Sequence, residues 1–322
     1  GLMLRRFDEV RRWKRRMEDQ WFTDIAFYLS HQWVSWNDRT RRFETPQSPT
    51  WRVRLTVNYV LMMVDTLVSL MTKNRPSRGV IPASDEDKDV SNARVCEKLL
   101  ESRWEDERAE MKLRDLILWT ALTGNGFTSR EWNTLAGEDI VGPEYKNGAE
   151  TGKKKNYKLG EQELRVVSPF NIFPDAGATD LHEAEWIIET SFPAVEKIRD
   201  RFPEHRDSLH PESSGSLYRQ DLDYSMRLLF EFSAGVGYDA RPTDDIVDRL
   251  FLLKMYGRPT RKFPDGYCVI GTPSQILYKG PNPYDHHDLP YCHLKYTHVP
   301  GAFFGQSMVA PIRGLQVEYN KS

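Results

Sequence analysis

The chain has 322 residues, enough for a sizeable hydrophobic core and, by length alone, for about two domains. Its 45 Lys and Arg nearly balance 47 Asp and Glu, so the net charge of −2 gives no overall attraction to nucleic acid or to an anionic membrane. Cys96, Cys268 and Cys292 are too far apart for a disulfide framework, and the first residues lack the apolar core of a signal peptide. We therefore expect reduced thiols in a cytosolic setting.

Residues 4–33 have the spacing of a long amphipathic helix. Apolar side chains between Phe7 and Tyr28 recur every three or four positions, as one buried helix face requires. Residues 5–16 also contain seven Arg or Lys against two acidic residues. This basic face is either an ordinary solvated surface or a set of phosphate contacts. The candidates for phosphate contacts are Arg11, Arg12, Arg15 and Arg16.

The strongest helical pattern lies at residues 52–76, after a loop predicted at 37–50. Apolar residues from Val57 to Met71 share one face, which we expect to be buried, and Met62 and Met63 add apolar surface on other sides. Such a helix packs on several sides or lies in an interface. Pro76 ends it. Polar residues interrupt an apolar run that is too short for a membrane span.

Helices are also predicted over residues 84–122. Ser84 and Asp87 have the spacing of a capping box at their start. The sequence Gly-Asn-Gly at 124–126 should end the last of these helices, because glycine and asparagine tolerate the left-handed conformation of a helix cap. Up to this point the chain is predicted to be helical.

Short β-like runs dominate the rest of the chain. A strand is predicted at 127–133, then a loop or a long exposed hairpin at 135–163, then strands interrupted by one helix that begins near Pro193. The turn signal at 264–266 separates two strands. These patterns predict an α+β fold with a helical N-terminal part at 1–133 and a β-rich α+β domain at 134–300. Residues 301–322 read as a loop and the start of a helix, so we expect the chain to be incomplete or unusually short.

Several segments resemble catalytic motifs but lack residues that those motifs require. Residues 148–154 lack the first glycine and the final Ser or Thr of a phosphate loop. Residues 235–237 lack the third glycine of a dinucleotide fingerprint, and Ser307 lacks the second glycine of a nucleophile elbow. Asp175 has no acid and lysine at the spacing of a nuclease, and it more plausibly turns the chain after a strand. We expect no enzyme activity and no cofactor.

Residues 285–298 are rich in the side chains that bind metals. They include Asp285, His286, His287, Asp288, Cys292, His293 and His298. Neighbouring prolines and strand-like alternation indicate turns and strands, and the spacings are not those of a zinc site, so we expect no metal centre. A metal-dependent hydrolase built on His286, His287, Cys292 and His293 is kept as a rival hypothesis.

Several segments, spread in order over nearly the whole chain, resemble the portal proteins (head-to-tail connectors) of tailed bacteriophages. They are Tyr-Leu-Ser-His-Gln-Trp at 28–33, Arg-Leu-Thr-Val-Asn-Tyr-Val at 54–60, Lys-Asn-Arg-Pro at 73–76, Ala-Leu-Thr-Gly-Asn-Gly-Phe at 121–127, the stretches 164–175 and 184–189, Gly-Gln-Ser-Met-Val at 305–309, and residues 315–322. Each segment alone is weakly specific, whereas the ordered set is a stronger signal. The resemblance assigns these residues mostly to the wing region of such a subunit.

This resemblance implies a non-enzymatic, homo-oligomeric ring of about twelve subunits at one capsid vertex of the virion, assembled in the host cytoplasm. Double-stranded DNA would pass through it without sequence specificity. The implied partners are the major capsid protein, the packaging terminase and the head-completion or neck proteins, with no membrane partner.

A closed ring requires two different surface patches on each subunit. Large aromatic side chains are frequent in protein interfaces, and we expect Trp33, Trp36 and Phe43 near a subunit contact. The alternative hypothesis is another virion structural protein, or a DNA-binding helical protein that uses the basic face at residues 5–16.

Overall fold

The computed structural model describes residues 1–33, 35–37, 42–44, 55–74, 76, 79–134, 136–146, 149–211 and 249–321. Helices dominate the first part of the chain and antiparallel strands the second, so the predicted α+β fold is confirmed. The helices are α1 (Leu2–Tyr28), α2 (Tyr59–Thr72), α3 (Asp87–Asp106), α4 (Ala109–Thr123), α5 (Val195–Arg201) and α7 (Val309–Lys321), with short 3₁₀ turns η1 (Pro169–Asn171) and η2 (Pro203–Ser208).

Two larger sheets form the centre of the molecule. One has the strand order β11-β10-β9-β8-β7, the other β12-β3-β6, and the pairs β1-β2 and β4-β5 stand apart from them. The strands are β1 (Ser35–Asn37), β2 (Arg42–Glu44), β3 (Asn125–Asn133), β4 (Asp139–Lys146), β5 (Ala149–Lys158), β6 (Glu161–Val167), β7 (Ile172–Pro174), β8 (Trp186–Ser191), β9 (Leu252–Gly257), β10 (Tyr267–Gly271), β11 (Ile276–Gly280) and β12 (Tyr291–Lys295).

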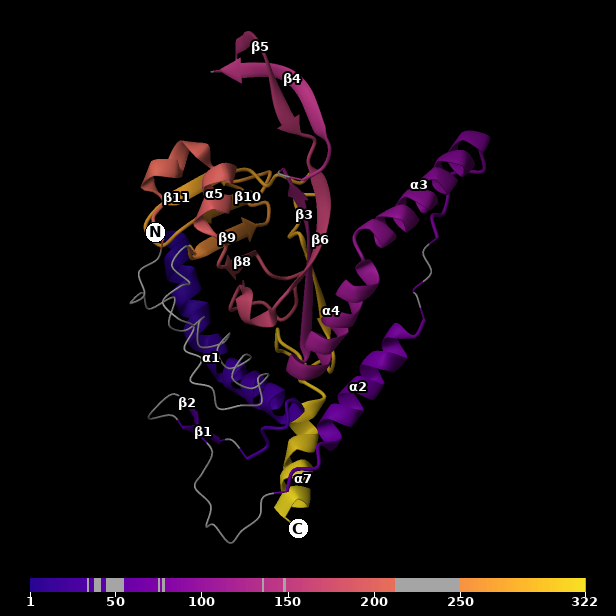
Figure 1. Cartoon of the computed structure of the whole chain (residues 1–322), viewed down its shortest axis with the longest axis vertical. Helices are drawn as coiled ribbons and strands as arrows, with labels where there is room; N and C mark the ends of the chain where they lie inside the picture. The colour runs from indigo at the N-terminus through magenta and orange to yellow at the C-terminus, as the bar shows by residue number, and fades with distance from the viewer. Residues whose placement is uncertain are drawn as a thin grey trace.

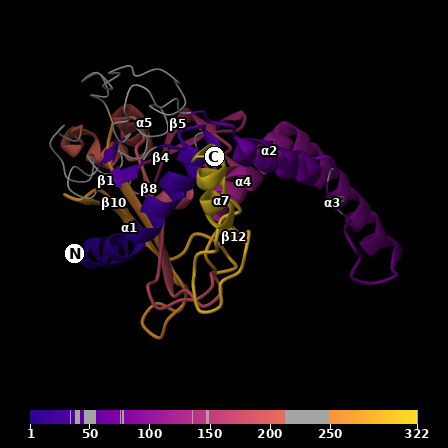
Figure 2. The ribbon, with the colours of Figure 1, turned by 90° about the horizontal axis from the view of Figure 1, so that it is seen from below.

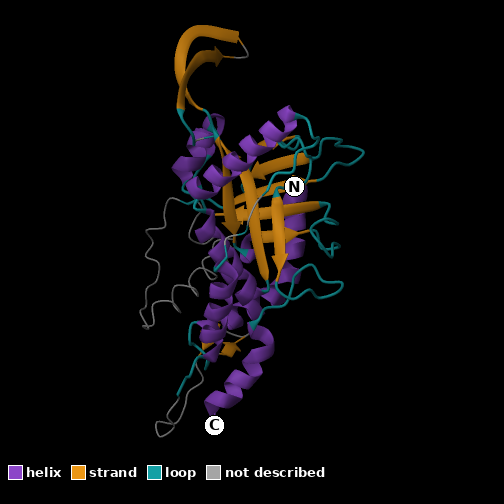
Figure 3. Ribbon diagram, turned by 90° about the vertical axis from the view of Figure 1, so that its right-hand side faces the viewer, coloured by secondary structure: helices purple, strands orange, loops and turns teal. Residues whose placement is uncertain are grey.

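The elements have a distinct arrangement around the two sheets. Helix α1 lies along one side, while α2 and α3 lie on the other, and the β4-β5 hairpin projects at the end opposite α7 (Figure 1). Figure 3 shows the strands of the two larger sheets running in crossing directions. Strands β4 and β5 pair antiparallel, so the hairpin alternative predicted for residues 135–163 is confirmed.

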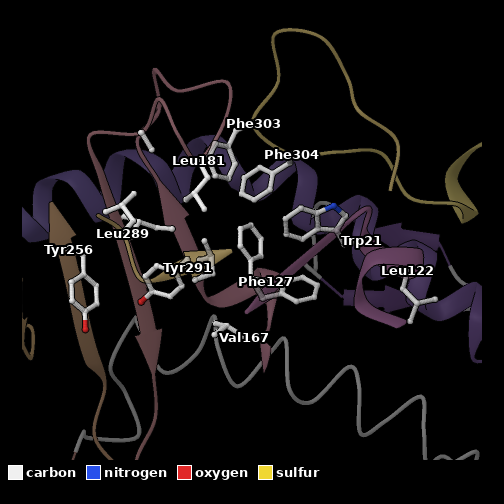
Figure 4. Close-up of a cluster of buried hydrophobic side chains, with 14 of the residues drawn as sticks. Trp21, Leu122, Phe127, Val167, Leu181, Tyr256, Leu289, Tyr291, Phe303 and Phe304 are labelled. Atoms are coloured by element: carbon white, nitrogen blue, oxygen red, sulfur yellow. The ribbon is translucent and has the colours of Figure 1, made fainter. Parts of the chain in front are cut away.

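One large apolar core joins α1, α2 and α4 to both sheets. Phe127 on β3 is fully buried at its centre, near Phe303, Phe304 and Trp21 (Figure 4). A smaller cluster joins the first turns of α1 to the five-stranded sheet, where the rings of Phe7 and Phe173 lie 4.8 Å apart. Both ends of α1 are thus fixed by aromatic packing against segments that come much later in the sequence.

Helix α1 ends at Tyr28, so the prediction that it continues to residue 33 was wrong. Ser30 takes a left-handed conformation with φ 70°, and the amide of His31 donates to the carbonyl of Ala26 at 2.8 Å. This is the hydrogen-bond pattern of a helix end with a left-handed cap residue. The chain turns there and continues toward β1, which with β2 occupies part of the predicted loop at 37–50.

Helix α2 is shorter and less buried than the pattern at 52–76 predicts. Only Val60, Val64 and Val68 of its residues are buried, whereas Val57 and Met71, expected on the buried face, are exposed. The buried valines form a single narrow stripe because α2 packs mainly on α4. Leu67 is partly buried against the core, whereas Met62, Met63, Leu70 and Met71 of α2 are exposed.

The predicted capping box at Ser84 is not formed. Helix α3 begins at Asp87, its cap residue Glu86 makes no side-chain capping bond, and the Ser84 hydroxyl donates instead to the carboxylate of Asp89 at 2.5 Å. Likewise α5 begins at Val195, after the predicted start at Pro193. The β-like run at 226–234, one of the strands predicted after residue 163, and the glycines at 235–237 lie outside the described residues.

The turn predictions agree with the structure. Residues 264–266 connect β9 and β10, and Gly266 has φ 70°. Asp175 follows the last residue of β7, and its carboxylate accepts a hydrogen bond from the amide of Gly177 at 3.4 Å.

No described helix has the length and apolar character needed to cross a membrane.

Candidate functional site

The predicted basic face of α1 is smaller than the sequence suggests, because two of its cations are used internally. Lys14 is fully buried, its ammonium donates to the carbonyl of Phe170 at 2.6 Å, and it lies 3.1 Å from Glu18. Burial lowers the pKa of Lys14 to about 8. The guanidinium of Arg6 donates to the hydroxyl of Tyr267 at 2.8 Å. These two side chains hold α1 against the sheets.

The four candidates for phosphate contacts lie farther along α1. Arg12, Arg15 and Arg16 are exposed, and Arg11 is half-buried with its guanidinium 5.9 Å from the centre of the Phe7 ring. The Nε of Arg12 donates to the backbone carbonyl of Asp8 at 3.1 Å. At spacings of three and four residues, Arg12, Arg15 and Arg16 share one exposed surface of α1.

The predicted interface aromatics lie beyond the end of α1. The indole nitrogen of Trp33 donates to the hydroxyl of Thr56 at 2.9 Å. Trp36 and Phe43 are direct partners in the antiparallel pair β1-β2, whose side chains lie outside the described part of the structure. The β1-β2 pair lies on the α1 side of the molecule (Figure 1).

Two glycine-containing segments from distant parts of the sequence meet at the end of α4. Gly124 caps α4 with φ 79°, and a Cβ placed on it would lie 2.5 Å from the backbone carbon of Gln306. The side chain of buried Asn125 accepts from the amide of Gly305 at 2.7 Å and donates to its carbonyl at 3.3 Å. The segments at 121–127 and 305–309 therefore form one junction.

Ser307 has a structural role at this junction. Its hydroxyl accepts a hydrogen bond from the amide of Ala310 at 3.0 Å and so caps the start of α7. The same hydroxyl donates to the carboxylate of Asp24 on α1 at 2.5 Å, and Arg313 of α7 donates to the other oxygen at 3.0 Å. Asp24 thus ties the start of α7 to α1.

Asp24 gives this junction a pH dependence. Burial raises the pKa of its carboxyl from 3.8 to about 6, against the opposing effects of Ser307 and Arg313. A folded-state pKa above the unfolded value stabilises the fold at low pH, and this contribution is lost as pH rises through about 6. Relative to an Asp24→Asn variant, the native chain should lose roughly 2–3 kcal/mol of unfolding free energy between pH 4 and pH 7. Urea unfolding of both proteins across that range measures the difference, and parallel curves would contradict it.

Amide side chains connect the middle of α7 to α2. The buried side chain of Gln316 donates to the backbone carbonyl of Val57 at 2.7 Å. The side-chain oxygen of Asn320 accepts a hydrogen bond from the backbone amide of Val57 at 3.3 Å. Asn320 also donates to Gln32. Asn58 caps α2 by accepting from the amide of Leu61 at 3.0 Å. Helix α7 is therefore held by α1 at its start and by the segment before α2 along its second half.

Within residues 285–298, His286 and His293 have the structural contacts of ordinary polar groups. The ring of His293 lies nearly parallel to the rings of Phe127 and Phe303, with centroids 4.2 and 5.1 Å away, and its Nε2 lies 3.0 Å from the side-chain oxygen of Asn125. Burial lowers the pKa of His293 to about 3. His286 Nδ1 accepts from the amide of Asp288 at 2.9 Å. Among the described residues, no three His, Cys, Asp or Glu side chains gather in a way that could hold a metal ion.

A buried ionic network that the sequence did not reveal links the two sheets. Lys254 of β9 donates to both carboxylate oxygens of Glu131 of β3, at 2.8 and 2.6 Å. Arg165 of β6 bridges Glu131 at 3.0 Å and Glu189 at 2.9 Å, and Tyr291 donates to Glu189 at 2.6 Å. Alternating polar residues in strands usually indicate a solvated face, so no local signal distinguishes this network.

Apolar side chains are exposed along α2 and α3. On α2 they are Met62, Met63, Leu70 and Met71, and on α3 they are Val95, Leu99 and Leu100. Figure 2 shows α3 extending away from the rest of the molecule, on the side opposite α1. Where such exposed apolar side chains form a contiguous patch, the patch marks an interaction site in soluble proteins.

Comparison with known protein families matches residues 4–322 to the phage P22-like portal protein family. A comparison with curated proteins found no match. The family match covers almost the whole chain, and it confirms the portal resemblance of the ordered segments. Portal proteins have a structural role in the phage virion and in DNA packaging. The chain belongs to the phage P22-like portal protein family.

Proposed function

We propose that this chain is a subunit of a ring of about twelve copies that forms the conduit for DNA packaging and ejection at one capsid vertex. The observation that carries the proposal is the family match over residues 4–322. The ring would contact the major capsid protein and be the docking site of the packaging terminase and later of the neck proteins. It would assemble in the host cytoplasm and let double-stranded DNA pass without base-specific contacts.

The proposed wing region includes the helical part at 1–133 and the β-rich part at 134–300, while residues 301–322 form a loop and helix α7. The ties from Asp24 to Ser307 and Arg313 support this division of roles, because they fix the direction of α7 against α1. A ring subunit needs such a rigid connection if forces on one element are to reach the other.

The mass of the particle in solution tests the proposal. The natural full-length product, purified at moderate salt, is expected to give a mass of about twelve subunits by light scattering and ring-shaped particles by electron microscopy. A monodisperse monomer at micromolar concentration would contradict the proposal. The chain would then be examined as a DNA-binding protein.

We also propose that Trp33, Trp36 and Phe43 lie near the subunit contact. Their alanine variants are expected to need about tenfold more protein for half-maximal ring assembly, because aromatic anchors in interfaces contribute about 1–2 kcal/mol or more. Analytical ultracentrifugation over a concentration series measures this. Replacing the exposed Trp132 by alanine is the control outside the proposed contact. Normal assembly of all three variants would refute the assignment.

A second function rests on the exposed arginines of α1. If Arg12, Arg15 and Arg16, together with Arg11, contact phosphates, the monomer should bind duplex DNA with an affinity that falls steeply with salt. Each phosphate contact adds about 0.9 to the slope of log K against log salt concentration. A slope near zero for the monomer would leave these arginines to other partners.

A further inference from the structure

The β4-β5 hairpin stands apart from the rest of the subunit. Its strands pair with each other from Asp139 and Lys158 to Lys146 and Ala149, and with no other described strand. Figure 1 and Figure 3 both show it projecting beyond the two larger sheets, at the end of the molecule opposite α7. No described side chain of the hairpin belongs to either apolar core cluster. The hairpin is therefore not needed to complete the core of the subunit.

The chain closes at the base of the hairpin without help from its strands. The amide of Leu159 donates to the carbonyl of Glu138 at 2.9 Å, and the amide of Gly160 donates to the carbonyl of Ala136 at 3.0 Å. The outgoing and returning parts of the chain thus lie side by side between β3 and β6. The hairpin can be shortened at this point without changing the path of the chain into β6.

Lysines are concentrated on the second strand of the hairpin. Residues 139–158 have five Lys and three acidic residues, and four of these lysines lie on β5. Lys158 is used at the base, where its ammonium lies 3.0 Å from the carboxylate of Asp139. The other three are consecutive, at 153–155. Since successive strand positions alternate between the two faces, this run places cationic residues on both faces of the hairpin.

The composition of the hairpin does not suit an apolar protein interface. Residues 142–156 contain no Val, Ile, Leu, Met, Phe or Trp, and Tyr145 is their single aromatic residue. The exposed apolar side chains Ile140, Val141 and Leu159 lie only at the base. Protein interfaces have apolar and aromatic cores and are depleted in lysine. A lysine-rich ribbon of this kind fits a polyanion better.

The partial phosphate-loop sequence lies in the same hairpin. Residues 148–154 combine glycines with lysines, the residue types that contact phosphates in such loops. In the structure, however, residues 149–158 form strand β5 and not a loop that leads into a helix, so they cannot cradle a nucleotide in that way. A two-stranded ribbon fits the width of the DNA major groove, and lysines neutralise the phosphates beside it. DNA is also the polyanion that a protein of the portal family meets during packaging.

We propose that the β4-β5 hairpin is a DNA-contacting arm, in which the lysines at 153–155 bind the phosphate backbone of double-stranded DNA. The inference rests on the proposed function in one respect, that DNA is the molecule which the assembled subunit meets. It assigns a DNA contact to an element separate from the arginines of α1. Contacts to phosphates carry no base sequence, as DNA that moves past the protein requires.

Removing the three charges tests the arm. The full chain with Lys153→Gln, Lys154→Gln and Lys155→Gln should bind a short duplex of mixed sequence at least about tenfold more weakly at low salt. The slope of log K against log salt concentration should fall by about 2–3, because each phosphate contact contributes about 0.9. Fluorescence anisotropy of labelled duplex measures both quantities. Arginine at the same three positions keeps the charge and should keep the binding.

A matched control removes the same charge elsewhere. Lys88→Gln, Arg94→Gln and Lys98→Gln change three exposed positions on α3, and this variant should bind DNA as the native chain does. A second variant replaces residues 139–158 by Asn-Gly, the residues of a two-residue hairpin turn. It should lose the same affinity but keep the native midpoint of urea unfolding, because the hairpin lies outside both core clusters.

Four outcomes would overturn the proposal. Native affinity in the glutamine variant would leave the lysines only the role of keeping the hairpin edges from pairing with other strands. An equal loss in the α3 control would show a general effect of charge. Loss of binding only when Arg12, Arg15 and Arg16 are replaced would assign DNA to α1. Displacement by polyglutamate at the same charge concentration as by DNA would identify an acidic protein surface as the partner.

The mass of the particle separates this inference from the proposed function. The shortened chain should form rings of the native subunit number, and loss of its rings would assign the hairpin to a subunit contact instead. If the native chain forms no ring, the proposed function fails whatever the DNA result. If rings form and the glutamine variant binds DNA as the native chain does, only the DNA-contacting arm fails.

Discussion

Replacing Gly124 by alanine should lower the free energy of unfolding by about 2–5 kcal/mol. Gly124 has φ 79°, a conformation that costs a residue with a Cβ about 1–2 kcal/mol. The added Cβ would also lie 2.5 Å from the backbone carbon of Gln306 and 2.6 Å from the carbonyl oxygen of Gly305. Backbone atoms cannot rotate away as a side chain can, so α4 and the segment before α7 must separate. Urea unfolding measures the loss.

Gly301 is the matched control for this substitution. It also has a positive φ, 77°, but nothing lies within 4 Å of a Cβ placed on it. Gly301→Ala should therefore cost only the conformational part, about 1–2 kcal/mol. If both variants lose the same stability, the close approach of the two segments does not contribute, and the junction is looser than the distances indicate.

Residue patterns could predict the helix end at Gly124 but not what packs against it. The sequence Gly-Asn-Gly predicts a left-handed cap, and the structure has one. The cap alone favours glycine at position 124. The structure makes this requirement stricter, because backbone atoms of Gly305 and Gln306, far along the chain, occupy the space that a side chain would need. Long-range contacts of this kind leave no local pattern, although both segments were among those that carried the portal resemblance.

Helical periodicity predicted which elements exist better than which faces are buried. The spacing of apolar residues located α2 and α3, but periodicity alone assigns every apolar stripe to a core. Val60 and Val64 are buried against the rest of the subunit, whereas Val95 and Leu99 are exposed. In an assembling subunit an apolar stripe can serve a neighbour instead of the core, and a single sequence has no signal that separates the two uses.

Breaking the ionic network between the sheets should cause the other large loss of stability. Glu131→Leu leaves the ammonium of Lys254 buried without the carboxylate that it contacts in the described structure, and removing one partner of a buried pair costs about 3–5 kcal/mol. Lys254→Met should cost less, about 2–3 kcal/mol, because Glu131 keeps Arg165 at 3.0 Å. Urea unfolding at pH 7 compares the two variants.

The double variant Glu131→Leu with Lys254→Met separates the cost of an unpaired charge from the value of the pair. Burial alone would raise the pKa of Glu131, but Lys254 and Arg165 together hold that pKa below its ordinary value, so the carboxylate is charged in the fold. Removing both partners leaves Arg165 paired with Glu189, and neither position 131 nor position 254 then carries a charge. The double variant should therefore be more stable than Glu131→Leu alone by about 2 kcal/mol or more. Additive losses would mean that the two side chains stabilise the sheets independently, and that their contact is not what joins β3 to β9.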